Sequence, residues 1–130
     1  MKEVKLYVTI ARSKQTVFEF TINPNNTPKW ITSIVKEEAS SELVTVGTKY
    51  KNSDSDGNVN EYVVTVFEPF NCFQLDATHQ DYKVKYTYRE IASDLTELEY
   101  HEWSESGQLH APFMQEILDT LKLVLESGRG

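Results

Sequence analysis

The sequence predicts an α+β fold in which a curved antiparallel sheet wraps around one long C-terminal helix. Six segments with the composition of strands follow one another through the middle of the chain, separated by short connections, which is typical of an antiparallel meander. In the last segment the apolar residues recur with the period of a helix. Because strands and helices are segregated along the chain, the pattern excludes a doubly wound α/β fold.

The N-terminal part of the chain predicts one strand followed by two short helices. Apolar and polar side chains alternate over residues 4–10, as they do in a half-buried strand. A helix is expected over residues 14–22, with Ser13 as its cap. A second short helix is expected over residues 27–31, with Pro28 in its first turn.

Strand signals dominate the middle of the chain, where runs rich in β-branched and aromatic residues alternate with turn-forming clusters. One such cluster, residues 52–58, consists of Asn, Ser, Asp and Gly, which tolerate left-handed backbone or bond their own main chain. The expected strands are residues 34–39, 46–51, 59–68, 72–78, 82–91 and 95–103.

Residues 112–127 predict the longest helix of the chain. One side of it is apolar, with a stripe formed by Phe113, Met114, Ile117, Leu118, Leu121, Val124 and Leu125. A single helix about 10 Å in diameter cannot cover the whole inner face of a curved sheet, so unfilled space is expected beneath it. We expect Phe113, Met114 and Ile117 to form one wall of this space and the leucines of the stripe to anchor the helix.

Composition and charge narrow the class of protein. The chain has 130 residues, the size of one domain, and its single cysteine excludes an intramolecular disulfide. Its net charge of −7 argues against a nucleic-acid partner, and Lys83, Lys85 and Arg89 alternate with tyrosines as on a solvated strand face. No segment resembles a signal peptide or a membrane span, so we expect a cytoplasmic protein without membrane insertion.

A further set of positions is spread over almost the whole chain. It comprises Ile10-Ala11-Arg12-Ser13, Val17-Phe18, Phe20, Asn23-Pro24, Trp30, Val46-Gly47-Thr48, Val66-Phe67-Glu68-Pro69, Tyr86, Tyr88, Leu98, Leu118, Leu121 and Leu125. In these residues and in the order of its elements, the chain resembles the START-like (SRPBCC) superfamily. This superfamily includes polyketide cyclase/dehydratase-like proteins, lipid-transfer domains and birch-pollen-type allergens. The resemblance implies a helix-grip fold, with residues 1–130 forming a single domain.

The resemblance leaves three functions open. The first is a carrier or sensor that binds a small hydrophobic or aromatic ligand, such as a lipid or a polyketide, in an internal cavity. The second is a polyketide cyclase- or dehydratase-like enzyme, and the third is a protein-interaction module. The superfamily shares no catalytic signature, and a fold alone does not fix an activity. The sequence leaves the ligand and the oligomeric state open.

Strand parity predicts which side chains face the space under the helix, because alternate residues of a strand point to opposite faces. The predicted inner sets are Phe73, Leu75, Ala77 and His79 in one strand and Tyr82, Val84, Tyr86 and Tyr88 in the next. The ligand pocket is therefore expected to be lined by Trp30, Thr48, Phe73, Leu75, His79, Tyr86, Tyr88, Phe113, Met114 and Ile117.

Two residues are candidates for catalysis. Histidine changes its charge near neutral pH, and His79 is expected at the rim of the cavity, whereas Glu102 is a candidate general base. The alternative for His79 is a histidine at a strand end that bonds to backbone or water. For Trp30 and the pocket tyrosines, the alternative is packing within the core. No cofactor motif and no defensible metal-ligand spacing is present, so neither a cofactor nor a metal is expected.

Overall fold

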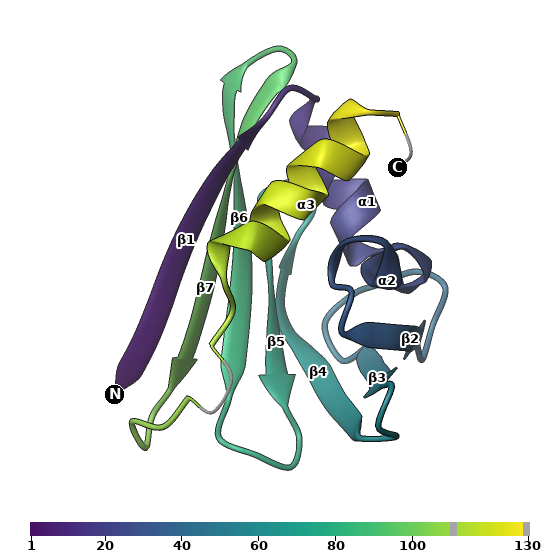
Figure 1. Ribbon diagram of the computed structural model, residues 1–130, viewed down its shortest axis with the longest axis vertical. Coiled ribbons are helices and arrows are strands. Elements are labelled where there is room, and N and C mark those ends of the chain that lie inside the picture. The colour runs from purple at the N-terminus through teal and green to yellow at the C-terminus, as the bar shows by residue number, and fades with distance from the viewer. Residues whose placement is uncertain (110–111, 129–130) are drawn as a thin grey trace.

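The chain forms one curved sheet of seven strands with helices on its concave side (Figure 1). The computed structural model describes residues 1–109 and 112–128. All strand pairs are antiparallel, in the order β1-β7-β6-β5-β4-β3-β2. The elements are β1 (Lys2–Ile10), α1 (Lys14–Ile22), η1 (Pro24–Asn26), α2 (Thr27–Trp30), β2 (Ile34–Ala39), β3 (Lys49–Asp54), β4 (Val59–Glu68), β5 (Cys72–Ala77), β6 (Lys83–Ala92), β7 (Leu95–Ser104) and α3 (Gln115–Glu126).

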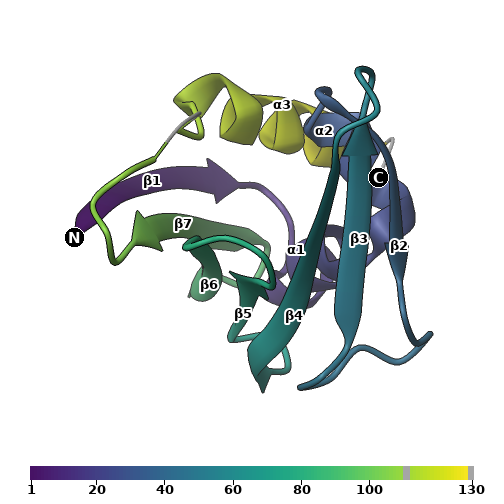
Figure 2. The same cartoon turned by 90° about the horizontal axis from the view of Figure 1, so that it is seen from below.

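The structure confirms the predicted α+β architecture. Strands β2 to β7 form the six-strand meander, and β1 pairs with β7. Figure 2 shows the sheet curling from β1 round to β2, with α3 lying over its concave side. The cap of α1 is also as predicted, because the hydroxyl of Ser13 accepts the backbone N–H of Thr16 at 3.2 Å. Two elements begin three residues later than predicted, and both differences affect the interior of the molecule.

The first wrong boundary is that of β3, which begins at Lys49 rather than at Val46 and ends at Asp54. A turn precedes the strand, closed by a hydrogen bond from the N–H of Thr48 to the carbonyl of Thr45. Gly47 in this turn has a φ of +94°, which a residue with a side chain rarely adopts. The strand therefore includes residues 52–54, which were expected to form part of a turn, and Asn52 lies in the strand.

The second wrong boundary is the start of α3, which begins at Gln115 and not at Pro112. Met114 has extended backbone, with φ −117° and ψ 150°. The N–H of Phe113 donates to the carboxylate of Glu102 at 3.2 Å, and its ring stacks on Tyr100 with the centroids 3.9 Å apart. These contacts hold Phe113 against the sheet, so the helix begins only after it, at Gln115.

The apolar face of α3 packs into the core. Leu118 and Leu121 are fully buried, and Val124 and Leu125 are nearly so. They belong to one hydrophobic core with buried residues of β1, α1 and β7. α3 is the longest helix with 12 residues, and no helix in the described part of the chain is long and apolar enough to cross a membrane.

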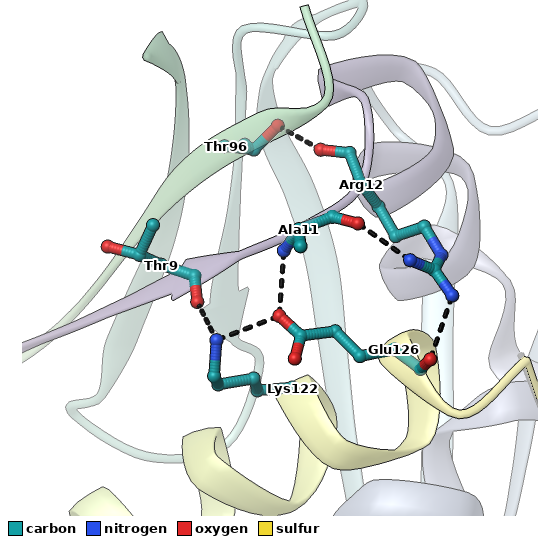
Figure 3. Close-up of polar contacts among 6 residues, drawn as sticks. All are labelled: Thr9, Ala11, Arg12, Thr96, Lys122 and Glu126. Carbon is teal, nitrogen blue, oxygen red and sulfur yellow. Dashed lines mark hydrogen bonds and ion pairs between the residues drawn. The ribbon is translucent and has the colours of Figure 1, made fainter. Parts of the chain in front are cut away.

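The C-terminal end of α3 is bound to the junction between β1 and α1 (Figure 3). The ammonium group of Lys122 donates to the carbonyl of Thr9 at 2.6 Å and to the carboxylate of Glu126 at 2.7 Å. The same carboxylate accepts the N–H of Ala11 at 2.7 Å, and the guanidinium group of Arg12 donates to the carbonyl of Glu126 at 2.9 Å. These contacts fix the position of α3 on the sheet.

Candidate functional site

The concave side of the sheet contains a cavity of about 470 Å³ that is partly open to solvent. Its walls come from α1, α2 and the loop after α2, from the strands β2 to β7, and from the segment that precedes α3. No residue of α3 itself lines it. The unfilled space predicted from the sequence therefore exists, but it lies beside the terminal helix rather than against it.

Aromatic rings form much of the cavity wall. The ring of Tyr86 stacks on Phe73 at a centroid distance of 5.0 Å and meets Tyr100 edge-on at 5.4 Å. Trp30 meets both Tyr86 and Phe113 edge-on, at 6.3 and 6.1 Å. Such edge-on and stacked pairs are the arrangements that aromatic rings prefer. The eight aromatic residues of the lining are Trp30, Tyr50, Tyr62, Phe73, Tyr82, Tyr86, Tyr100 and Phe113.

Glu102 is a buried carboxylate on the inner face of β7, only 1% exposed. Its Oε1 accepts hydrogen bonds from the hydroxyl groups of Tyr82 at 2.9 Å and Tyr100 at 2.7 Å, and its Oε2 accepts the N–H of Phe113. Burial raises the pKa of both tyrosines, so both hydroxyl groups remain donors at neutral pH. Among the described residues, no basic side chain forms an ion pair with Glu102.

Glu37 on β2 is a second carboxylate in the cavity wall. The hydroxyl of Thr27 donates to its Oε1 at 2.5 Å, and the side-chain amide of Asn52 donates to its Oε2 at 3.1 Å. Burial raises the pKa of Glu37, and these two hydrogen bonds oppose the shift only in part. No Lys, Arg or His of residues 1–109 and 112–128 forms an ion pair with it. The cavity thus contains a carboxylate that is unfavourable to ionise.

More exposed polar residues form the rim of the cavity. Gln80 and Asp81 come from the loop between β5 and β6, and Asp54 lies at the end of β3. The carboxylate of Asp81 accepts the backbone N–H groups of Glu105 at 3.1 Å and Ser106 at 2.6 Å. Hydrogen bonds from Ser106 and Glu105 lower the pKa of Asp81 to about 2, so this part of the rim is negatively charged at neutral pH.

Half of the predicted pocket residues lie in the cavity wall. Trp30, Phe73, Leu75, Tyr86 and Phe113 line it, as does Glu102, the candidate general base. In β7, the side chains of Leu98, Tyr100 and Glu102 are buried on the inner face of the strand.

The other predicted pocket residues lie outside the wall. β5 ends at Ala77, so strand alternation no longer applies at His79, which is exposed in the following loop. The expectation that His79 faces the cavity is therefore wrong. Thr48 is buried, but its hydroxyl accepts the N–H of Thr45 at 3.1 Å and closes the turn before β3.

Tyr88, Met114 and Ile117 are also displaced from the predicted wall. Tyr88 is buried under α1, where its hydroxyl is hydrogen-bonded to that of Thr21 at 2.5 Å. Met114 is 59% exposed because it precedes the first turn of α3 in extended conformation. Ile117 is half-buried and packs against the core. The expectation that α3 itself forms a cavity wall is wrong.

Glu37 is one of the site residues that sequence reasoning missed, together with Tyr50, Tyr62, Asp54 and Asp81. The pairing of β2 with β3 shifts register between Ile34 and Lys36, and this irregularity interrupts strict alternation. Ile34 and Glu37 therefore both line the cavity although they are three residues apart. The sequence did contain one signal, because the charged residues Lys36 and Glu38 flank Glu37 at alternate positions. In the structure these two residues form an ion pair at 2.8 Å on the exposed side of the strand, and Glu37 points to the opposite side.

Replacing Glu37 by glutamine is expected to raise the melting temperature at pH 7–8, with a gain that shrinks toward pH 4. The raised pKa means that the folded chain binds more protons than the unfolded chain in the pH range between 4.5 and the higher folded-state pKa of Glu37. Stability is therefore lost as the pH rises through the folded-state pKa, and the variant escapes this loss. Thermal unfolding across this pH range measures it. Glu38→Gln is the matched control, because Glu38 is exposed and its pKa is lowered by Lys36; a gain of equal size there would contradict the account.

Comparisons with known proteins bear on the fold. No protein-family model and no curated protein matches the sequence. Similar solved structures include XoxI from Bacillus cereus, with a TM-score of 0.76, 14% identity and coverage of 100% of this chain and 99% of that chain. Another is Aha1 from Colwellia psychrerythraea, solved as a dimer, with a TM-score of 0.73, 17% identity and full coverage of both chains.

A third similar structure is DynU16, a protein of the dynemicin biosynthetic locus. It has a TM-score of 0.73 and 18% identity, and the match covers 98% of this chain but 48% of DynU16. At such identities the similarity concerns the fold alone. The curled antiparallel sheet and the C-terminal helix, together with these structures, show that the chain has a helix-grip fold.

Proposed function

We propose that this chain is a START-like protein that binds a small hydrophobic or aromatic molecule in its interior, as a carrier or sensor. The observation that carries the proposal is the cavity of about 470 Å³ with its eight aromatic side chains. Ligand pockets of proteins are about 300–1,000 Å³ in volume, mostly apolar, with a few polar groups that orient the ligand. The volume fits this range, and the eight aromatic and five aliphatic residues of the lining supply its apolar part.

The energetics of the cavity support an occupant. Apolar surface that is left without contacts is unfavourable, so the aromatic part of this partly open pocket is covered either by water or by a ligand. Water needs polar partners, which Glu37, Glu102 and the tyrosine hydroxyl groups offer only in part of the wall. A ligand with an apolar body satisfies the aromatic part as well.

The position of His79 and the hydrogen bonds of Glu102, the two candidate catalytic residues, favour binding over catalysis. His79 lies outside the cavity, and both carboxylate oxygens of Glu102 already accept hydrogen bonds. Each oxygen of Glu102 is already engaged by a donor of the protein, so a substrate proton would have to compete with these donors for it. DynU16 belongs to a biosynthetic locus, which is compatible with a small-molecule ligand for proteins of this shape. Carriage requires only the shape and the apolar lining.

The test is native mass spectrometry of freshly purified protein. We expect a mass above that of the apo chain, which disappears on denaturation together with the release of one small molecule. Removing the ligand is expected to lower the melting temperature, because a ligand that binds only the folded state stabilises it by mass action. A chain that carries no small molecule and binds none of the aromatic probes described below would contradict the proposal and favour a protein-interaction module.

A further inference from the structure

We infer that the molecule bound in this cavity is a cation: an aromatic or alicyclic body that carries a protonated amine or a quaternary ammonium group. The inference rests on the proposed function and specifies the chemical class of its ligand. Two features of the cavity lead to the positive charge, namely the negative sign of its own charges and its aromatic rings. A third feature, a buried hydrogen-bond donor without a partner, bears on whether a molecule is bound.

The charged groups that line the cavity in the described part of the chain all have the same sign. Four carboxylates line it, those of Glu37, Asp54, Asp81 and Glu102. Within residues 1–109 and 112–128, no lysine, arginine or histidine is part of the lining. The net charge of the whole chain is −7, so the molecule as a whole also attracts cations and repels anions. A fatty acid or another carboxylate would meet only repulsion from these groups.

The two inner carboxylates are held by neutral donors. Glu102 accepts from two tyrosine hydroxyl groups and one backbone N–H, and Glu37 accepts from a threonine hydroxyl and an amide. These bonds orient the carboxylates but do not neutralise their charge. Burial already disfavours the ionised form of Glu37. A ligand cation supplies the missing opposite charge, and it does so where water is partly excluded and electrostatic attraction is strongest.

Aromatic side chains lie close to these carboxylates. Tyr82 and Tyr100 bond to Glu102 directly, and Tyr62 lies beside Tyr82 with the ring centroids 6.3 Å apart. The pKa of Tyr62 is raised to about 12 by burial first, and then by the negative charges of Glu37 and Glu102. The hydroxyl group of Tyr62 therefore lies within electrostatic range of both carboxylates. Cations bind over the faces of tyrosine and tryptophan, and aromatic cages are a common way of holding quaternary ammonium groups.

An independent feature indicates a bound molecule rather than a merely acidic surface. Trp30 lines the cavity and is 2% exposed, and its indole N–H is a buried donor without an acceptor. Buried donors are nearly always satisfied, because leaving one unpaired is unfavourable. The nitrogen itself is not exposed to the cavity, so an acceptor on a bound molecule reaches it only if the surrounding wall moves. The ligand that fits best combines an apolar ring system with a cationic nitrogen.

Three probes of similar shape and different charge test the effect of ligand charge on affinity. They are biphenyl-4-methylamine, biphenyl-4-methanol and biphenyl-4-carboxylate. At pH 7 and low salt, calorimetry is expected to show the amine binding about tenfold or more tighter than the alcohol, with the carboxylate weakest. An amine that binds no better than the alcohol overturns the inference but leaves the proposed function standing. Failure of all three probes also overturns the inference. The proposed function falls only if native mass spectrometry detects no bound molecule either.

Variants of the cavity glutamates test which carboxylate causes the preference for the amine over the alcohol. Glu37→Gln is expected to reduce the preference for the amine over the alcohol by about threefold or more, while Glu38→Gln changes it by less than about twofold. Glu38 is the neighbouring glutamate on the exposed side of the same strand, so the two variants lose the same charge. Binding of the alcohol shows that the cavity of each variant is intact. Glu102→Gln is the second variant and is expected to act like Glu37→Gln. An unchanged preference in both cavity variants overturns the inference.

Discussion

Leu121→Ala is expected to lower the free energy of unfolding by about 2–5 kcal/mol, as truncations in well-packed cores do. Leu121 is 0% exposed and packs, with Leu118 and Leu125, between α3 and the sheet. The loss combines the transfer free energy of the removed methyl groups with the cavity that they leave. Because the contacts of Lys122, Glu126 and Arg12 fix the end of the helix, the surrounding chain cannot easily collapse into the gap. Urea unfolding monitored by circular dichroism measures the change.

Leu123→Ala is the matched control for this prediction. Leu123 lies in the same helix, and the substitution is the same, but its side chain is 62% exposed. The control is expected to change stability by less than about 0.5 kcal/mol. Equal losses at both positions would mean that α3 does not pack on the sheet through this face.

The elements that the sequence predicted well are those with a strong and uninterrupted periodicity. The stripe of Leu118, Leu121 and Leu125 is buried as predicted, because helical spacing leaves these residues on one face. In β6 the alternation of lysines with apolar and aromatic residues assigned Val84, Tyr86 and Tyr88 to the interior, where they are buried.

The errors arose where local periodicity yields to tertiary contacts. Phe113 continues the apolar stripe of α3 in the sequence, yet its contacts with Glu102 and Tyr100 engage it with the sheet before the helix begins. The register shift in β2 hid Glu37, and the end of β5 at Ala77 removed His79 from the inner face. Such interruptions depend on the partner strands, which a pattern within one segment does not contain.

Val84→Phe is expected to abolish ligand binding, with a loss in affinity of at least about tenfold. Val84 lies on β6 in the cavity wall, so a phenyl ring at this position occupies the space of the ligand. Overpacking a solid core costs about 1–3 kcal/mol, whereas filling a cavity costs less, so the stability of the variant should change little. Thr87→Phe is the control, because Thr87 has the opposite parity on the same strand. A large loss of stability in Val84→Phe alone would mean that no cavity exists there.

The central claim, that a small molecule binds inside the sheet beside Trp30, is tested most directly by the two indole N–H resonances in ¹H–¹⁵N NMR spectra. Trp30 lines the cavity, whereas the indole of Trp103 on β7 donates to Glu105 at 3.2 Å and is not part of the lining. Titration with the tightest-binding biphenyl probe is expected to shift the Trp30 resonance and leave that of Trp103 in place. In Val84→Phe the shift should disappear, and in Thr87→Phe it should remain. Binding that moves the Trp103 resonance but not that of Trp30 would contradict the account.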